Sequence, residues 1–293
     1  MEKNRQQKQE RPQLLRVEHL TVSYGEKPVV KDVSFTLAEG EILGIAGESG
    51  SGKSTILRSV LGLAKTQRMT VEGDICYRGK KLLELPKRQL RQLRGPELGI
   101  VFQDCRSAMC PVRTVGAQIY ETIREHEKIS MPEVKKRAEE VMRKIGLTDA
   151  DRVWDSYPFE LSGGMNQRVG ICLAMMMRPK LLLADEPTSA LDVTVQKQVA
   201  EELLLMRKEY GTAMLLVTHN IGLIRFMADQ VLVLKDGMIQ DYGSCKEVLE
   251  HPKSAYTRTL LDSVLRLRIP EAEGEDSRTG FPVRPTCDPV MSK

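Results

Sequence analysis

The chain has 293 residues, of which 41% are hydrophobic, and this is enough for one large domain or two modest ones with a buried core. Lysine and arginine total 44 against 40 aspartates and glutamates, so the net charge of +4 gives no reason to expect nucleic acid or an anionic membrane surface as a partner. No apolar run approaches the roughly 20 residues that span a bilayer, and the N-terminus lacks an apolar signal region, so we expect a soluble, cytosolic chain.

The first part of the chain predicts a tail followed by antiparallel strands. Residues 1–13 are basic and rich in glutamine, which is typical of a disordered tail. Residues 14–20 and 29–37 alternate apolar and polar side chains between turn signals, which predicts short antiparallel strands with Tyr24 in the turn between them. Residues 73–79 predict a further hairpin segment.

A glycine-rich segment then lies between a predicted strand at 42–46 and a predicted helix at 55–61. Its sequence, Gly47-Glu48-Ser49-Gly50-Ser51-Gly52-Lys53-Ser54, fits the pattern G-x-x-x-x-G-K-[ST]. The glycines allow backbone N–H groups to face an anion, and the following helix directs its positive dipole end to the same place. Lys53 can then reach terminal phosphates, and the Ser54 hydroxyl can ligate Mg²⁺. Alone, the motif indicates only a P-loop nucleoside triphosphatase that binds through residues 47–55.

The middle of the chain changes in character. Residues 98–102 predict a buried strand that ends at Gln103. From residue 114 to about 147 the apolar positions have helical spacing, and Pro132 starts a second helical segment. We therefore expect a helical insertion over about 104–165.

Helix and strand alternate in the second half. Ser162 is the expected N-cap of a helix that reaches Met177, and residues 181–184 predict a short buried strand. Residues 193–210 predict a helix that ends at Gly211. Residues 213–217 predict one more strand, directly before Thr218 and His219. This alternation is typical of a parallel α/β sheet. Asp185 and Glu186 follow a strand at the edge where such sheets bind ligands, so Asp185 is a candidate for Mg²⁺ and Glu186 for the general base that polarises water.

The end of the chain predicts two short helices, at 245–250 and 255–267, and then a flexible tail over 270–293. No internal repeat is visible, so one nucleotide-binding unit is expected. The six cysteines include no C-x-x-C pair and give no support to a zinc or disulfide framework.

Two further short segments and one histidine resemble the motifs of a known protein family. Leu161-Ser162-Gly163-Gly164, Ser189-Ala190-Leu191-Asp192 and His219 are similar to the signature, D-loop and switch histidine of ABC-type ATPases, and the match runs from Leu15 to about residue 267. The resemblance implies that Ser162, Gly163 and Gly164 close on the γ-phosphate of ATP held by a second subunit. It also implies that Tyr24 stacks on adenine, that Gln103 links the Mg²⁺ and water site to the helical insertion, and that His219 contacts the γ-phosphate.

These observations predict one fold class: an α/β P-loop NTPase core of the RecA-like type, with an N-terminal antiparallel β subdomain and an inserted α-helical subdomain. We expect an ABC ATPase domain over 14–245, a C-terminal extension over 246–269 and the tail over 270–293. The expected cofactors are ATP and Mg²⁺.

Further motifs resemble one branch of the family. Met165-Asn166-Gln167-Arg168, Val193-Thr194-Val195-Gln196 and the segment 251–261 are similar to ATP-binding subunits of oligopeptide, dipeptide and nickel importers. Residues 104–111, which the resemblance places toward the permease, look closer to nickel systems, and Cys287 alone remains of a cysteine cluster that several peptide-type members carry.

This branch implies a second ABC ATPase subunit in a heterodimer, two integral-membrane permease subunits and an extracytoplasmic substrate-binding protein, with no nucleic acid. The chain would then lie at the cytoplasmic face of the membrane. The alternatives are a soluble ABC ATPase that acts in translation or DNA maintenance, which usually carries two ATPase units or a coiled-coil insertion, and a P-loop kinase, which Leu161 to Gly164 disfavour.

Overall fold

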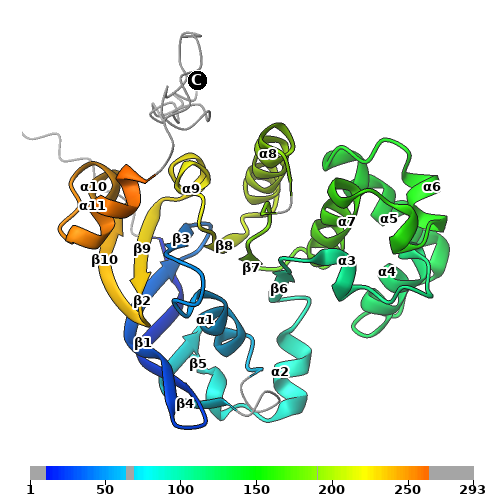
Figure 1. Cartoon of the computed structure of the whole chain (residues 1–293). Coiled ribbons are helices and arrows are strands. Elements are labelled where there is room, and N and C mark those ends of the chain that lie inside the picture. The colour runs from blue at the N-terminus through cyan, green and yellow to red at the C-terminus, as the bar shows by residue number, and fades with distance from the viewer. Residues whose placement is uncertain (1–10, 64–68, 190, 264–293) are drawn as a thin grey trace, which may run out of the picture.

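The computed structural model describes residues 11–63, 69–189 and 191–263. These residues form two sheets and a separate group of helices (Figure 1). The first sheet has the order β2-β1-β4-β5 and the second the order β10-β9-β3-β8-β7-β6. In the second sheet β10 pairs with β9 antiparallel and the remaining neighbours are parallel. The expected α/β core with an antiparallel β subdomain is therefore confirmed.

The antiparallel sheet is built from β1 (Gln13–Tyr24), β2 (Lys27–Ala38), β4 (Met69–Tyr77) and β5 (Lys80–Lys81). The expectation of short strands was wrong, because β1 and β2 are each 12 residues long. The turn between Tyr24 and Lys27 joins them. β-Bulges interrupt the alternation of apolar and polar residues, so the sequence pattern shows only part of each strand. His19 and Asp32 both have positive φ, and the register shifts between Val17 and Leu20.

The mixed sheet is built from β3 (Ile42–Ala46), β6 (Leu98–Val101), β7 (Leu181–Asp185), β8 (Ala213–Val217), β9 (Gln230–Lys235) and β10 (Met238–Ser244). Its parallel strands are buried on both faces, as their near-continuous apolar runs require. Leu43 and Ile45 pack with the antiparallel sheet and with α1 (Lys53–Val60), whereas Ile42 and Ala46 belong to the core formed with the helices. The sheet thus separates two hydrophobic cores.

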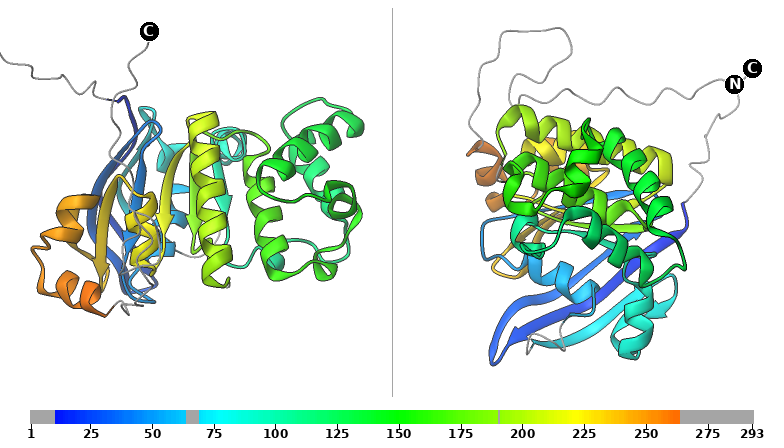
Figure 2. Two further views of the ribbon diagram at one scale, coloured as in Figure 1. Left: turned by 90° about the horizontal axis from the view of Figure 1, so that it is seen from above. Right: turned by 90° about the vertical axis from the view of Figure 1, so that its right-hand side faces the viewer.

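The helical insertion contains α3 (Cys105–Ala108), α4 (Val115–Arg124), α5 (Met131–Lys144), α6 (Ala150–Asp155) and the start of α7 (Gly163–Met175). It lies to one side of the sheets in Figure 1 and in the left view of Figure 2. A capping box between Ser130 and Glu133 starts α5, with Pro132 in its first turn. Gly116 allows α4 to approach α6, because an added Cβ would lie 2.2 Å from the Trp154 ring.

The remaining helices are α2 (Lys87–Leu93), α8 (Val193–Tyr210), α9 (Ile221–Met227), α10 (Cys245–Glu250) and α11 (Ala255–Asp262), with single 3-10 turns at Leu82–Glu84 and Pro158–Glu160. The expected helix over 193–210 is confirmed, and Gly211 closes it at φ 65°. Of the regions expected near the ends, residues 1–10, 264–269 and the tail 270–293 lie outside the described residues. None of the helices in the described ranges has both the length and the apolar character to cross a bilayer.

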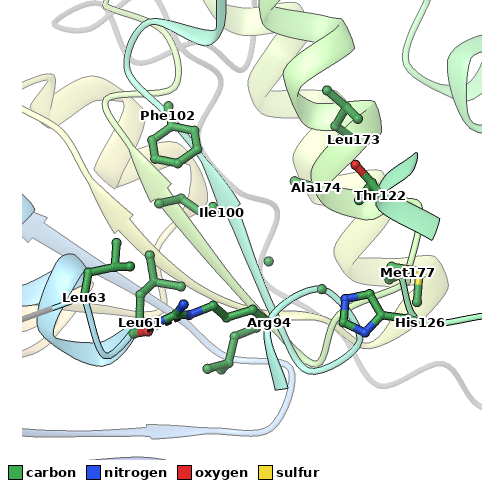
Figure 3. Close-up of a pocket in the computed structure, with 13 residues that line it drawn as sticks. Leu61, Leu63, Arg94, Ile100, Phe102, Thr122, His126, Leu173, Ala174 and Met177 are labelled. Atoms are coloured by element: carbon green, nitrogen blue, oxygen red, sulfur yellow. Dashed lines mark hydrogen bonds between the residues drawn. The ribbon is translucent and has the colours of Figure 1, made fainter. Parts of the chain in front are cut away.

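An apolar cavity of about 380 Å³ lies beside β6, where this strand meets α4 and α7 (Figure 3). Leu61 and Arg94 line it from the side of the core, Phe102 from the end of β6, and Thr122 and Leu173 from α4 and α7. Phe102 remains 44% exposed although it is aromatic. The helical insertion is thus joined to the core with an open apolar groove beside the joint.

Candidate nucleotide site

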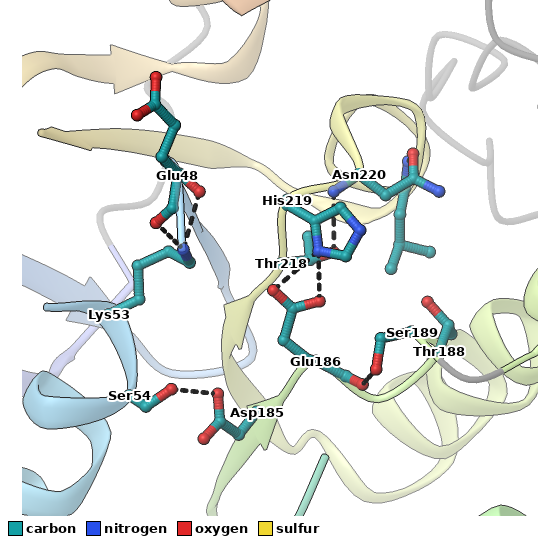
Figure 4. Close-up of polar contacts among 12 residues, drawn as sticks. Glu48, Lys53, Ser54, Asp185, Glu186, Thr188, Ser189, Thr218, His219 and Asn220 are labelled. Atoms are coloured by element: carbon teal, nitrogen blue, oxygen red, sulfur yellow. Dashed lines mark hydrogen bonds and ion pairs between the residues drawn. The ribbon is translucent and has the colours of Figure 1, made fainter. Parts of the chain in front are cut away.

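Three parallel strands bring the polar motifs to one edge of the sheet. The strands β3, β7 and β8 end at Ala46, Asp185 and Val217, and Val217 is in register with both Ile45 and Asp185. The glycine-rich loop, the pair Asp185 and Glu186, and the segment 218–220 therefore lie together (Figure 4). This is the edge at which open α/β sheets bind their ligands.

The loop before α1 depends on its glycines. Gly47, Gly50 and Gly52 have φ values of 147°, 81° and 105°. A Cβ at Gly47 would lie 2.1 Å from the Leu234 carbonyl oxygen, and one at Gly52 would lie 2.8 Å from the Val29 carbonyl oxygen. The backbone can follow this path only without side chains at these two positions.

Lys53 occupies the centre of the loop. Its Nζ donates to the carbonyl oxygens of Gly47 and Glu48, each at 2.7 Å, and the residue is buried. Burial lowers the pKa of Lys53, while the nearby carboxylates of Glu186 and Asp185 act in the opposite direction. A buried ammonium group whose hydrogen bonds here go to carbonyl oxygens would gain from an incoming anion.

Ser54 and Asp185 form an oxygen pair from distant parts of the chain. The Ser54 hydroxyl donates to Asp185 Oδ1 at 2.8 Å. Burial raises the pKa of Asp185, and the hydrogen bond from Ser54 partly offsets this effect. A hydroxyl next to a carboxylate is a donor set that Mg²⁺ prefers, and a bound cation would also stabilise the charged form of Asp185.

Glu186 and His219 form the second pair. His219 Nδ1 lies 2.9 Å from Glu186 Oε1, with the glutamate side chain 12% exposed and the imidazole 64% exposed. Glu186 has a φ of 48°, and its backbone N–H donates to the Val217 carbonyl oxygen at 2.8 Å. This left-handed conformation turns the carboxylate from the end of β7 toward the histidine that follows β8.

A cavity of about 190 Å³ lies over the loop, and it suits a phosphate chain. Among the described residues, the buried Ser51 Oγ has no hydrogen-bond partner, so the loop retains an unused polar atom. Nine residues line this cavity. Eight of them were expected from the sequence, namely Ser49, Gly50, Gly52, Lys53, Ser54, Thr55, Gln103 and Glu186, and the ninth is Val29. Tyr24 at the end of β1 is not among them.

The signature residues occupy a different place. Ser162 caps α7, since its hydroxyl accepts from the Met165 N–H at 3.3 Å, which confirms the expected N-cap. An added Cβ at Gly163 would meet no atom within 4 Å. Ser162, Gly163 and Gly164 are absent from the lining of the cavity over the loop. The structure therefore leaves this helix N-terminus open to a contact from outside.

The segment that contains Ser189 and Asp192 is held by polar contacts that the sequence analysis missed. Asp192 caps α8 through a hydrogen bond from the Val195 N–H at 3.1 Å. Gln196 donates to the carbonyl oxygens of Thr188 and Leu191, and Asn220 Nδ2 donates to Gln196 Oε1 at 3.0 Å. Asn220 directly follows His219 and caps α9, and this N-cap was a sequence signal that could have been recognised.

Comparisons with known proteins agree with this geometry. The family model described as ABC transporter matches residues 30–189. The ATP-binding protein CntD of a metal-staphylopine import system, from Staphylococcus aureus, is 42% identical over 85% of this chain and 93% of its own length. The oligopeptide transport ATP-binding protein OppD of Bacillus subtilis is 39% identical over 93% of this chain and 76% of its own length.

A solved structure shows the same fold. The ATP-binding cassette MJ0796, in a dimeric post-hydrolysis state bound to ADP and Pi, superposes with a TM-score of 0.70 at 31% identity and covers 79% of this chain and 99% of its own. The fold, the arrangement of the loop and carboxylates, and these relatives lead to one conclusion. The chain belongs to the ABC transporter family, as an ATP-binding subunit of an importer with ATPase activity coupled to transport.

Proposed function

We propose that this subunit hydrolyses ATP at a composite site between two subunits. The P-loop of one subunit would hold the phosphates, and Ser162, Gly163 and Gly164 of the facing subunit would close over the γ-phosphate through the N-terminus of α7. The observation that carries the proposal is the convergence of Lys53, Asp185 and Glu186 at one edge of the sheet, while the signature lies outside the cavity there. The dimeric state of MJ0796 supports the pairing.

The residue roles follow from this placement. The loop N–H groups and Lys53 bind phosphate oxygens, and Thr55 lines the same cavity. Glu186 takes the proton from the attacking water, and His219 orients that carboxylate and contacts the γ-phosphate. Ser54, Asp185 and Gln103 would hold Mg²⁺, which supplies charge neutralisation on the phosphates when bound.

Two further roles remain proposals that rest on the family resemblance. Tyr24, at the end of β1, would stack on adenine. Ser189 and Asp192 would form a D-loop at the subunit interface, where the hydrogen bonds of Gln196 and the Asp192 cap fix the segment.

The proposed assembly is a heterodimer of two ATP-binding subunits on two membrane-spanning permease subunits, served by an extracytoplasmic substrate-binding protein. The chain would then lie at the cytoplasmic face of the membrane, held by the permease. ATP binds the closed dimer better than the open one, so binding would close the dimer and swing the helical insertion, and hydrolysis would reset it. We propose that the permease contacts residues 104–111, next to the exposed Phe102.

The proposed cargo is a peptide or a metal complex. The support is the naming of the relatives, since CntD belongs to a metal-staphylopine import system and OppD to oligopeptide transport. The nickel preference expected from residues 104–111 is retained as the simplest metal alternative. Uptake of labelled nickel and of labelled short peptides in cells lacking this protein would decide between them, because only the true cargo should fail to accumulate.

The proposal of a composite site can be tested by comparing ATP turnover with the oligomeric state of the protein. ATP turnover of the purified subunit, alone and mixed with its partner subunit, is measured against concentration together with the mass in solution. Turnover should rise with the dimer fraction, because a lone subunit has only half of each site. Full turnover by a strict monomer would contradict the composite site.

A further inference from the structure

The C-terminal extension touches the P-loop directly. Tyr256 on α11 lies with its hydroxyl 3.3 Å from the backbone nitrogen of Glu48, and this N–H donates to the hydroxyl oxygen. The two residues are 208 positions apart. Lys235, at the end of β9, places its Nζ 4.6 Å from the centre of the Tyr256 ring. The ring is thus held on one side while its hydroxyl reaches the loop.

A buried carboxylate fixes the helix that carries Tyr256. Asp241 of β10 is 7% exposed and accepts from the N–H groups of Lys253 and Ser254, at 3.2 and 3.0 Å. The Ser254 hydroxyl accepts from the Tyr256 N–H at 3.1 Å, and Thr257 on the same helix is fully buried. The start of α11 is therefore anchored to the sheet by several contacts, and Tyr256 has little freedom of position.

Tyr256 and Lys53 bind opposite ends of one peptide group. The Gly47 carbonyl oxygen accepts from Lys53 Nζ at 2.7 Å, and the Glu48 N–H of the same peptide unit donates to Tyr256. Because this unit is planar, contacts at both ends fix its rotation. The turn between β9 and β10 holds the second half of the loop, where the Gly237 N–H donates to the Ser51 carbonyl oxygen at 3.1 Å.

We propose that Tyr256 is a positioning residue for nucleotide binding, through which the C-terminal extension holds the Gly47–Glu48 peptide in the orientation that receives phosphate. The inference rests on the proposed nucleotide site at the P-loop. Without the hydroxyl, this peptide gains rotational freedom that ATP must then remove on binding. Tyr256 is not among the residues that line the cavity over the loop, so its loss should weaken ATP binding and leave the chemical step unchanged.

The test compares Tyr256→Phe with Tyr242→Phe in the full chain. Tyr242 is a matched control, because its hydroxyl also makes backbone hydrogen bonds, with Thr36 at 3.2 Å, but on β2 rather than the P-loop. Titration with a fluorescent ATP analogue should show about threefold weaker binding for Tyr256→Phe, the size expected for one solvent-accessible hydrogen bond, and wild-type binding for Tyr242→Phe. In the assembled transporter, KM for ATP should rise by the same factor at unchanged kcat.

A second variant tests whether Asp241, which holds the start of α11, acts on the P-loop through Tyr256. Asp241→Asn should also weaken ATP binding, and the double variant Asp241→Asn/Tyr256→Phe should be no weaker than the worse single variant. Wild-type affinity in Tyr256→Phe, or fully additive losses in the double variant, would overturn the proposal. Lys53→Ala distinguishes failure of the proposed nucleotide site from failure of the role of Tyr256. If both Lys53→Ala and Tyr256→Phe bind ATP normally, the nucleotide site itself is wrongly assigned. If Lys53→Ala binds ATP weakly and Tyr256→Phe binds it normally, only the role of Tyr256 is rejected.

Discussion

The ion pair between Arg168 of α7 and Glu202 of α8 should make the stability of the protein depend on pH. Arg168 Nε lies 3.0 Å from Glu202 Oε1, and the two side chains are 16% and 11% exposed. Glu202 Oε2 is buried and has no hydrogen-bond partner among the described residues. Burial raises the pKa of Glu202 from 4.5 to about 7, and the attraction of Arg168 only partly offsets this effect.

A carboxyl group whose pKa is higher in the folded state binds more protons there than in the unfolded chain. Its contribution to stability is therefore complete below pH 4.5 and is lost as the pH rises to about 7. The difference between these two pKa values corresponds to a loss of about 2–3 kcal/mol between pH 5 and pH 8. Glu202→Gln keeps the shape of the side chain and removes this titration.

The assay is urea unfolding of wild type and Glu202→Gln at pH 5 and pH 8. Wild type should lose about 2–3 kcal/mol more than the variant between the two pH values, whatever constant offset the substitution adds. Glu201→Gln is the matched control, because Glu201 directly precedes Glu202 in α8 and is exposed. The charge of Glu201 is also the smallest of the influences on the pKa of Glu202. Equal pH dependence in wild type and Glu202→Gln would refute the reasoning.

Three further substitutions test the site and the packing. Glu186→Gln should keep ATP affinity and lower kcat about 100-fold or more, because the general base is lost, and turnover equal to wild type would remove Glu186 from this role. Lys53→Ala should weaken ATP binding about 100-fold in equilibrium titration, since charge-assisted hydrogen bonds to phosphate disappear, and an unchanged Kd would contradict the assignment. Gly116→Ala should lower stability by about 1–3 kcal/mol in urea unfolding, because the new Cβ would meet the Trp154 ring at 2.2 Å, and wild-type stability would show that the two helices separate freely.

The local signals in the sequence located the loops and helix ends that form the site. The strand, glycine loop and helix around Lys53 were predicted in order, and Ser162 and Gly211 do cap α7 and α8. The lengths of β1 and β2 were missed, because the bulges at His19 and Asp32 interrupt the alternation that marks a strand. Helix α9 was missed as well, although Asn220 caps it.

The sequence by itself determined which chemical groups are available and the local backbone that carries them, because glycine conformation, helix caps and apolar periodicity act within a few residues. Only the tertiary structure decided which groups meet. Ser54 bonds to Asp185 across 131 positions and Glu186 to His219 across 33, and both contacts depend on β3, β7 and β8 being neighbours. That strand order follows from packing the whole sheet between two cores, and no local pattern specifies it.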